Sequence, residues 1–167
     1  KYFVNKFLTL VVVYLSIQLY SHAEIIKKIE VDGNNRVNTE TIKIFSGVKN
    51  NDNLSSEDLN EVLKKLYETN FFENINLSIE NSILKISVIE NPIIQNLIIT
   101  GIENKTLKKK LFENITLKEK NPYVENEIRN NQDSIKNILQ EVGYYFSSVE
   151  ILKKDNVNNT IDLIFEI

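Results

Sequence analysis

The protein has 167 residues, 42% hydrophobic and 26% charged, which is the balance of a folded globular chain and not of a disordered one. Four glycines and two prolines are too few for a collagen-like or linker-like sequence. The net charge of −3 argues against a nucleic-acid-binding protein, which needs a basic surface to neutralise phosphates, so we expect no nucleic acid among the partners.

The first 23 residues have the pattern of a secretory signal peptide. Lys1 and Lys6 flank the start, an apolar run fills residues 7–19, and the Ser-His-Ala of residues 21–23 places small residues at a cleavage site. This run is shorter than the ~20 apolar residues that span a bilayer, which argues against a membrane anchor. We expect cleavage after Ala23. Because the chain lacks Met even at its first position, we also expect it to be a fragment.

The segment that follows begins with a strand and a short helix. The alternation over residues 26–31 predicts a strand that ends in a turn at Gly33. Asn38 or Thr39 can cap a short helix that Gly47 would end. Arg36 is expected to be exposed and solvated.

A longer helix and two strands come next. Ser55 and Asp58 form a capping-box pattern, and the apolar positions behind it repeat at helical spacing. These positions are Leu59, Val62, Leu63, Leu66 and Tyr67. Residues 72–80 and 83–90 predict two strands, joined by a hairpin turn at Asn81-Ser82.

The same order of elements then begins again. Residues 94–101 match residues 26–33 at an offset of 68, which indicates an internal repeat. The second copy has predicted helices over residues 104–112 and 125–142 and predicted strands over residues 146–152 and 160–166. The inner face of its longer helix is expected to hold Ile128, Ile135, Ile138, Leu139 and Val142. Five aromatic residues are expected to be core anchors between the longer helix and the strand after it: Phe71, Phe72, Tyr144, Tyr145 and Phe146.

These elements predict an α+β protein with two β-α-α-β-β modules, residues 24–91 and 92–167. In each module two helices should cover one face of a three-stranded mixed sheet. A short turn joins the last two strands and makes them antiparallel, whereas a helical crossover favours a first strand parallel to the third. The expected order is first, third, second. Pro92 leaves a linker of about two residues between the modules.

The second strand of each module is then an edge, with unpaired backbone groups that can accept a strand from another chain. Charges such as those of Glu73, Glu80 and Lys154 could instead serve only to protect the edge. We expect binding at Ile75, Asn76, Leu77, Ser78, Ile79 and Glu80 in the first module, and at Ser148, Val149, Glu150, Ile151, Leu152 and Lys153 in the second.

The residue types argue against catalysis. Without Lys1 and Lys6 the chain has 18 basic and 23 acidic residues, a net charge of −5, and its only histidine, His22, is lost with the signal segment. Cysteine is absent as well, so Ser-His-Asp relays, Cys nucleophiles and zinc sites built on His or Cys are excluded. No glycine-rich phosphate loop occurs. We expect no enzyme, no cofactor and no metal.

Several runs resemble a known family. They are Ile26-Lys-Lys-Ile29-Glu-Val31-Asp-Gly33, Leu66-Tyr67-Glu-Thr69-Asn-Phe71-Phe72, Leu84-Lys-Ile86-Ser-Val88-Ile-Glu90-Asn-Pro92 and Gly143-Tyr144-Tyr145-Phe146-Ser-Ser-Val149. Together they resemble the first two POTRA domains of outer-membrane protein assembly factors, and the resemblance covers residues 24–167. Asn70 stands where the family usually has Gly, and Asn also reaches the left-handed region. Ile102 stands where Asn often follows the first-strand Gly.

The resemblance implies a periplasmic arm in a Gram-negative type of envelope, ahead of a membrane-embedded β-barrel that is absent from this chain. It implies unfolded outer-membrane proteins as clients and accessory assembly lipoproteins as further partners. Two other interpretations stay open. One is the POTRA region of a related two-partner secretion or translocation-assembly transporter. The other is a periplasmic envelope scaffold without a barrel, which the early signal peptide disfavours.

Overall fold

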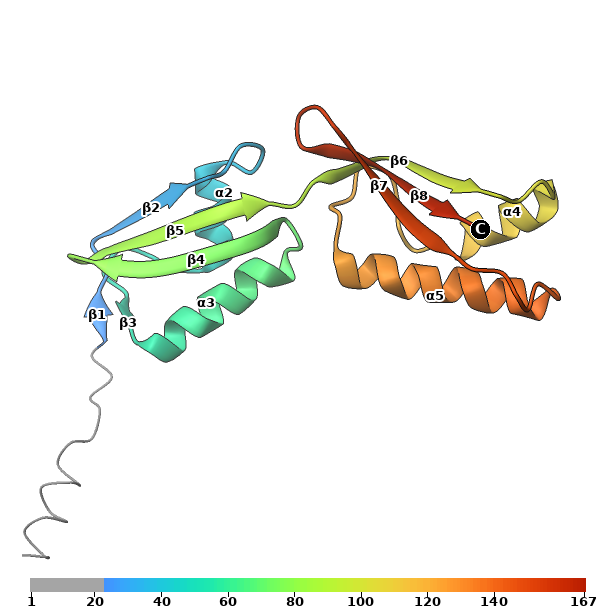
Figure 1. Ribbon diagram of the computed structural model, residues 1–167. Coiled ribbons are helices and arrows are strands. Elements are labelled where there is room, and N and C mark those ends of the chain that lie inside the picture. Colours follow the sequence, from blue (N-terminus) through green and yellow to red (C-terminus); the bar gives the residue numbers. More distant parts are fainter. Residues whose placement is uncertain (1–22) are drawn as a thin grey trace, which may run out of the picture.

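The computed structural model describes residues 23–167, which form two modules that lie end to end (Figure 1). The predicted signal peptide lies outside the described residues, apart from Ala23. The first module contains β1 (Glu24–Ile25), β2 (Lys28–Asp32), α2 (Thr39–Ser46), β3 (Asn53–Leu54), α3 (Ser56–Glu68), β4 (Phe72–Glu80) and β5 (Ile83–Glu90). The second contains β6 (Ile93–Thr100), α4 (Lys105–Asn114), α5 (Glu125–Glu141), β7 (Glu150–Asn156) and β8 (Thr160–Glu166).

Both modules have the predicted sheet. The strand order is β2-β5-β4 in the first and β6-β8-β7 in the second. The outer strands β2 and β6 run parallel to the central strand, whereas β4 and β7 run antiparallel to it. In Figure 1 the helices of each module lie on one side of its sheet. The α+β fold class and the order first, third, second are therefore confirmed.

Local signals set the ends of the helices in the first module. Asn38 caps α2 by accepting a hydrogen bond from the Thr41 N–H, and Gly47 ends it with a left-handed φ of 71°. At the start of α3 the Ser55 hydroxyl accepts from the Asp58 N–H, and the Asp58 carboxylate accepts from the Ser55 N–H. This reciprocal pair is the predicted capping box.

The two-residue strands β1 and β3 were not predicted. They pair antiparallel, with Glu24 opposite Leu54 and Ile25 opposite Asn53. The Glu24 carboxylate also accepts a 2.6 Å hydrogen bond from the Ser82 N–H in the β4–β5 turn. Two residues are too few to show an alternation in the sequence, so only the pairing partner reveals this element.

Each module has its own hydrophobic core between its sheet and its helices. The first core includes Ile26, Ile42, Leu66, Leu84 and Ile86, and the second includes Ile94, Ile99, Leu111, Ile135 and Phe165. No residue belongs to both clusters.

Two glycines fix the correspondence between the modules. Gly33 and Gly101 have φ values of 81° and 82°, and a Cβ atom on either would collide with a carbonyl oxygen. That oxygen belongs to Val88 in the first module and to Ile167 in the second. Position for position, Gly101 therefore corresponds to Gly33 and Ile167 to Val88.

The aromatic segment of the second module differs from the prediction. Phe72 is buried in the first core, whereas Tyr144, Tyr145 and Phe146 are exposed, and the Phe146 side chain is fully so at 102%. Val142, expected on the inner face of α5, is also exposed at 43%. The prediction was wrong because the chain turns after α5: both the N–H and the hydroxyl of Ser147 donate to the Tyr144 carbonyl.

As a consequence β7 begins at Glu150, four residues after the predicted start of this strand at residue 146.

Among residues 23–167, no helix is both long enough and apolar enough to cross a membrane.

Candidate functional site

The free edge of the first sheet is β4. All six residues predicted for this edge, Ile75 to Glu80, lie in β4, and no strand of residues 23–167 pairs with its outer side. Ile75 is buried in the first core, and Leu77 and Ile79 pack against that core. Side chains of Asn76, Ser78 and Glu80 alternate with these and therefore lie on the face away from the helices.

The hydrogen bonds of β4 show which backbone groups face outward. The Ile75 N–H donates to the Tyr67 hydroxyl at 3.1 Å and so points away from β5. In an antiparallel pair every second residue points the same way, which places the N–H groups of Leu77 and Ile79 on the open side. The Tyr67 hydroxyl therefore occupies the outward N–H group of Ile75, and the outward N–H groups of Leu77 and Ile79 remain as donors.

A groove runs between this edge and α3. It has a volume of about 330 Å³. Its lining comes from Ser56, Leu59, Asn60 and Leu63 of α3 and from Ile75, Asn76 and Leu77 of β4. Leu59 and Leu63 lie one helical turn apart and form its apolar wall, together with Leu77. An added strand would place alternate side chains in this groove while its backbone pairs with β4.

The free edge of the second sheet is β7. Fewer of the predicted edge residues lie in this strand than in β4. Of the six predicted residues, Glu150, Ile151, Leu152 and Lys153 lie in β7, whereas Ser148 and Val149 precede it. The predicted strand was therefore wrong at these two positions. The Val149 carbonyl accepts a 2.6 Å hydrogen bond from the Gln132 side chain of α5, which holds it out of the sheet ladder.

Charged side chains are frequent along the β7 edge, which contains Glu150, Lys153, Lys154 and Asp155. The Lys153 ammonium lies 5.2 Å from the centre of the Tyr123 ring, within range of a cation–π contact. Burial, followed by a hydrogen bond to Glu125, raises the pKa of Tyr123 to about 12. The Tyr123 hydroxyl donates to the Glu125 carboxylate at 2.7 Å. Charges of this kind blunt a sheet edge. Of the two predicted edges, β4 is the more open.

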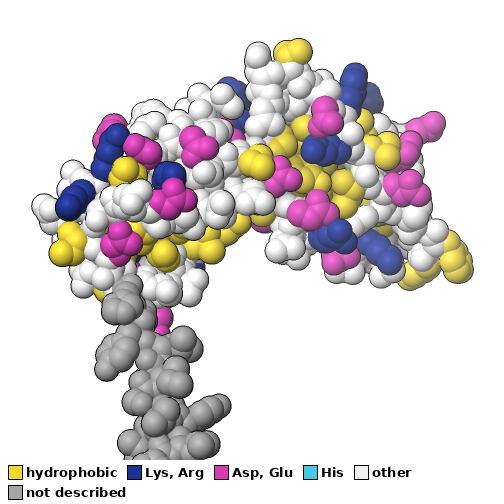
Figure 2. All heavy atoms as spheres, turned by 60° about the vertical axis from the view of Figure 1, so that its left-hand side comes forward, with side chains coloured by type: hydrophobic (Ala, Val, Ile, Leu, Met, Phe, Trp, Pro, Cys, Tyr) yellow, Lys and Arg dark blue, Asp and Glu magenta, His cyan; other side chains and the backbone are white. Residues whose placement is uncertain are grey.

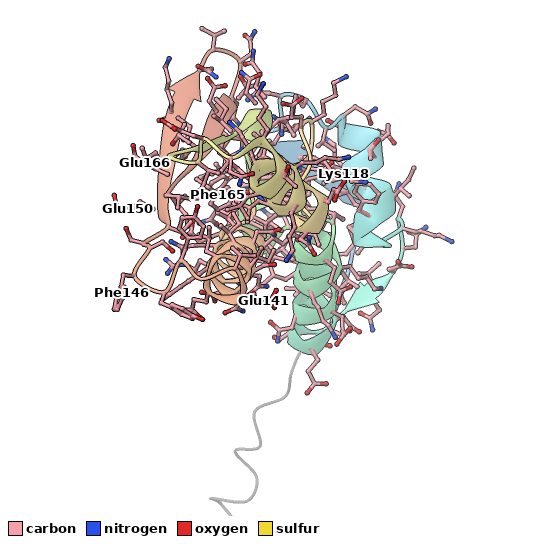
Figure 3. The ribbon with its side chains drawn as sticks, turned by 90° about the vertical axis from the view of Figure 1, so that its right-hand side faces the viewer. Lys118, Glu141, Phe146, Glu150, Phe165 and Glu166 are labelled. Carbon is pink, nitrogen blue, oxygen red and sulfur yellow. The ribbon has the colours of Figure 1, made fainter. Side chains whose placement is uncertain are left out.

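Hydrophobic side chains also reach the surface of the second module. Figure 2 shows them gathered on the module farther from the grey trace, among acidic and basic side chains. Figure 3 shows Phe146 extending outward from the α5–β7 connection. Exposed residues of this connection are Val142, Tyr144, Tyr145 and Phe146.

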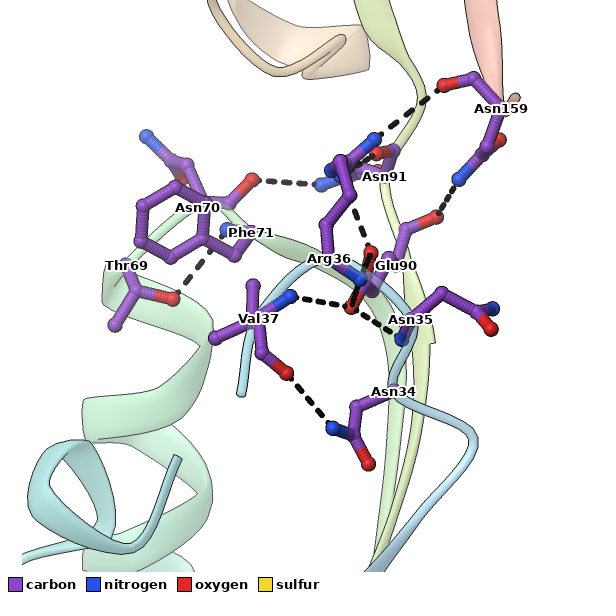
Figure 4. A network of polar contacts seen from close by, with 10 residues as sticks. All are labelled: Asn34, Asn35, Arg36, Val37, Thr69, Asn70, Phe71, Glu90, Asn91 and Asn159. Atoms are coloured by element: carbon purple, nitrogen blue, oxygen red, sulfur yellow. Dashed lines mark hydrogen bonds and ion pairs between the residues drawn. The ribbon is translucent and has the colours of Figure 1, made fainter. Parts of the chain in front are cut away.

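A buried carboxylate organises the end of the first module (Figure 4). Glu90, with 2% of its side chain exposed, accepts hydrogen bonds of 2.8 to 3.1 Å from the N–H groups of Asn35, Arg36 and Val37. The loop between β2 and α2 is thereby fixed to the last residue of β5. These partners are more than 50 residues apart in the chain, so no local sequence pattern predicts their contact.

Arg36 joins the two modules. It is exposed, as predicted, but its guanidinium also makes polar contacts with the protein. Its guanidinium donates to the Asn91 carbonyl at 2.8 Å and to the Asn159 carbonyl at 3.4 Å, and it lies 3.4 Å from the Glu90 carboxylate. Asn159, in the β7–β8 turn, donates from its side chain to the Glu90 carbonyl at 3.0 Å. The linker of Asn91 and Pro92 is therefore held by contacts from both sides.

Among residues 23–167 no group of three or more Asp, Glu, His or Cys side chains could hold a metal ion. The geometry supports binding of a polypeptide segment at a sheet edge.

Comparison with known proteins decides the family. The model of the POTRA family, described as a surface antigen variable number repeat, matches residues 24–91 and 92–167. The chain belongs to the POTRA family. The resemblance seen in the sequence is thereby confirmed.

Curated relatives of these POTRA domains are outer membrane protein assembly factors named BamA. The Neorickettsia risticii protein is 28% identical over 106 residues, which are 64% of this chain and 14% of that protein. The Neisseria meningitidis protein is 33% identical over 89 residues, 52% of this chain and 11% of that protein. The alignments thus cover only about an eighth of the length of these relatives.

Solved POTRA structures share the fold. The N-terminal domain of Omp85 from Thermosynechococcus elongatus aligns with a TM-score of 0.57 and 14% identity over 84% of this chain and 61% of that one. POTRA domains 1–2 of Omp85 from Anabaena align with a TM-score of 0.52 and 13% identity over 86% of this chain and 94% of that one. POTRA domains 3–5 of Haemophilus influenzae BamA give a TM-score of 0.52 and 15% identity over 90% and 68%.

Proposed function

We propose that this chain is the periplasmic POTRA arm of an outer-membrane protein assembly factor. In this proposal residues 24–91 and 92–167 are the first two POTRA domains, and unfolded outer-membrane proteins bind to the first by strand addition at β4. Accessory assembly lipoproteins dock on the same arm, and a β-barrel elsewhere in the protein anchors it to the membrane. The protein binds its clients and catalyses no reaction.

The observation that carries the proposal is the groove between α3 and β4. It combines outward-facing N–H groups at Leu77 and Ile79 with the apolar wall made by Leu59 and Leu63. Backbone pairing needs no particular client sequence, and the groove favours any strand that alternates apolar and polar residues. Strands of outer-membrane barrels alternate in this way.

Export through the inner membrane is part of the same proposal. The signal peptide comprises residues 1–23, and β1 begins at Glu24, directly after the proposed cleavage site. Mass spectrometry of the protein recovered from the periplasmic side of an expressing Gram-negative bacterium should give an N-terminus at Glu24. An N-terminus at or upstream of Lys1 would contradict cleavage.

The client site is tested by placing a charge in the groove. A urea-denatured outer-membrane β-barrel protein is diluted into buffer with the protein, and binding is measured by cross-linking through a photoreactive residue placed at Asn76. We expect Leu63→Asp to lower the cross-linked yield at least tenfold, because the charge would have to be buried by the bound strand.

The matched control is Ile44→Asp on α2, since Ile44 is 75% exposed and does not line the groove. It should leave the yield unchanged. Circular dichroism checks that both variants keep the fold. Equal yields for Leu63→Asp and the unaltered protein would contradict strand addition at β4.

A further inference from the structure

The two modules differ on the sheet face that their helices leave open. The positions match through Gly33 and Gly101, so the row Glu30, Lys85, Ser78 of the first module corresponds to the row Ile98, Ile164, Leu152 of the second. In both modules these three side chains are direct neighbours across the sheet. The first row is polar and the second is apolar.

The apolar row is not part of the second core. Ile99, Leu163 and Phe165 alternate with it and belong to that core, whereas Ile98 and Ile164 do not pack against it. Leu152 is 42% exposed. The row therefore lies on the solvent side of the sheet, opposite the helices.

Charges next to the rows differ as well. In the first module Lys28 pairs with Glu30 at 2.8 Å and Lys85 pairs with Glu80 at 2.6 Å, so both acidic side chains have a basic partner. In the second module Glu150 lies directly opposite Glu166, two residues along the strands from the apolar row, and on the other side of the row Lys154 lies opposite Asp162. Neither Glu150 nor Glu166 has a basic partner among residues 23–167.

The geometry of this acidic pair is unfavourable in the free protein. Like charges directly opposite each other on neighbouring strands repel. Figure 3 shows Glu150 and Glu166 on the outer side of β7 and β8, with Phe165 on the side of α4. A cationic side chain of a partner placed over this face would relieve the repulsion between Glu150 and Glu166. Apolar side chains of the same partner, next to the cation, would cover the apolar row.

We propose that the open face of the second sheet docks a basic amphipathic helix of a partner protein. Neighbouring strands lie about 4.8 Å apart, so the three side chains of the row span about 10 Å. This span equals the length of about two turns of an α-helix, and it is also close to the width of a helix. Apolar residues at positions i, i+4 and i+7 cover Ile98, Ile164 and Leu152. Lys or Arg beside them faces Glu150 and Glu166. This surface is separate from the β4 groove, and the inference stands without the proposed function.

The test uses two designed 14-residue amphipathic peptides, one of Leu and Lys and one with Glu in place of every Lys. Isothermal titration calorimetry measures the affinity of the protein for each. We expect the Lys peptide to bind at least tenfold more tightly than the Glu peptide, and this preference should decrease at high salt because salt screens exposed charges.

Three variants locate the site. Leu152→Ser copies the matched Ser78 of the first module and should weaken Lys-peptide binding at least fivefold. Ile89→Ser, which removes a side chain that is 57% exposed on the open face of the first module, should leave it unchanged. The double charge reversal Glu150→Lys with Glu166→Lys should reverse the preference in favour of the Glu peptide. Circular dichroism confirms that each variant is folded.

Other occupants give different results. Sedimentation that shows a dimer abolished by Leu152→Ser would overturn the proposal in favour of a second copy of this chain. Binding to anionic lipid vesicles that depends on Leu152 would overturn it in favour of a membrane surface. Equal affinities of both peptides for the unaltered protein, or equal effects of Leu152→Ser and Ile89→Ser, would also overturn it.

Discussion

Single residues at the junction between the modules make contacts that the surrounding sequence does not predict. Glu90 lies at the end of β5, where its carboxylate accepts from three successive N–H groups of the β2–α2 loop and faces Arg36. A buried charge is tolerated only when it is paired and hydrogen-bonded in this way. Exposed ion pairs, such as Lys85 with Glu80, contribute much less because water screens them.

The contrast between these two glutamates is a measurable prediction. Glu90→Ala should lower the free energy of unfolding by about 2 to 4 kcal/mol, because three N–H groups lose a charged acceptor and Arg36 loses its counter-ion. Glu80→Ala should lower it by less than about 1 kcal/mol. Urea unfolding followed by circular dichroism compares the two variants. Similar losses would show that the Glu90 network does not stabilise the fold.

At the scale of elements, helix ends depend on short-range chemistry. The capping box of α3 uses only Ser55 and Asp58, and the cap of α2 uses only Asn38 and the Thr41 N–H. Hydrogen bonds from the Ser55 hydroxyl, and then from its N–H, lower the pKa of Asp58. The ionised carboxylate is therefore the form that the folded helix end prefers.

The capping box predicts a dependence of stability on pH. Because the folded pKa of Asp58 lies below its unfolded value, its contribution is present above the ordinary value of 3.8 and is lost as the pH falls through the lowered pKa. Asp58→Asn should destabilise the protein at neutral pH, and the difference from the unaltered protein should shrink in stronger acid.

Thermal unfolding at several pH values measures this difference. Ser55→Ala, which removes the N-cap itself, should cost about 1 kcal/mol at neutral pH. Glu61→Gln is the control, because Glu61 is an exposed residue in the same helix. A difference for Asp58→Asn that stays constant down to strong acid would argue against the capping carboxylate.

At the scale of the whole molecule, two separate cores are joined by a two-residue linker and a small set of polar contacts. Arg36 and Asn159 each bind across the junction, and Asn70 donates from its side chain to Glu127 at 3.1 Å. These contacts, and not a shared hydrophobic interface, hold the modules in one orientation. The orientation is therefore expected to be sensitive to single polar substitutions.

Arg36→Ala combined with Asn159→Gly should loosen the junction while both modules stay folded. Glycine suits the left-handed φ of 52° at position 159, so the second change removes only the amide contact. NMR relaxation should then give each module a shorter rotational correlation time than in the unaltered protein. Lys28→Ala, an exposed change far from the junction, should have no effect. Unchanged correlation times in the double variant would mean that the linker alone sets the orientation.

How much the sequence could predict depends on the range of the interactions. Caps, turns and the pairing of β4 with β5 arise from residues close together in the chain, so their order and most of their ends were predicted correctly. Tyr144, Tyr145 and Phe146 were misplaced because an aromatic run looks the same whether it packs in a core or lies on a turn. The start of β7 was wrong for the same reason.

The sequence by itself determined the repeated β-α-α-β-β order, the strand order and the identity of the free edges, because hydrophobic periodicity, capping residues and short connections are local properties. Only the tertiary structure decided that α3 and β4 enclose a groove, that Glu90 receives the loop of Arg36, and that Ile98, Ile164 and Leu152 form one row. Each of these brings together residues far apart in the chain, and their meeting depends on strand register and helix packing, which no local pattern specifies.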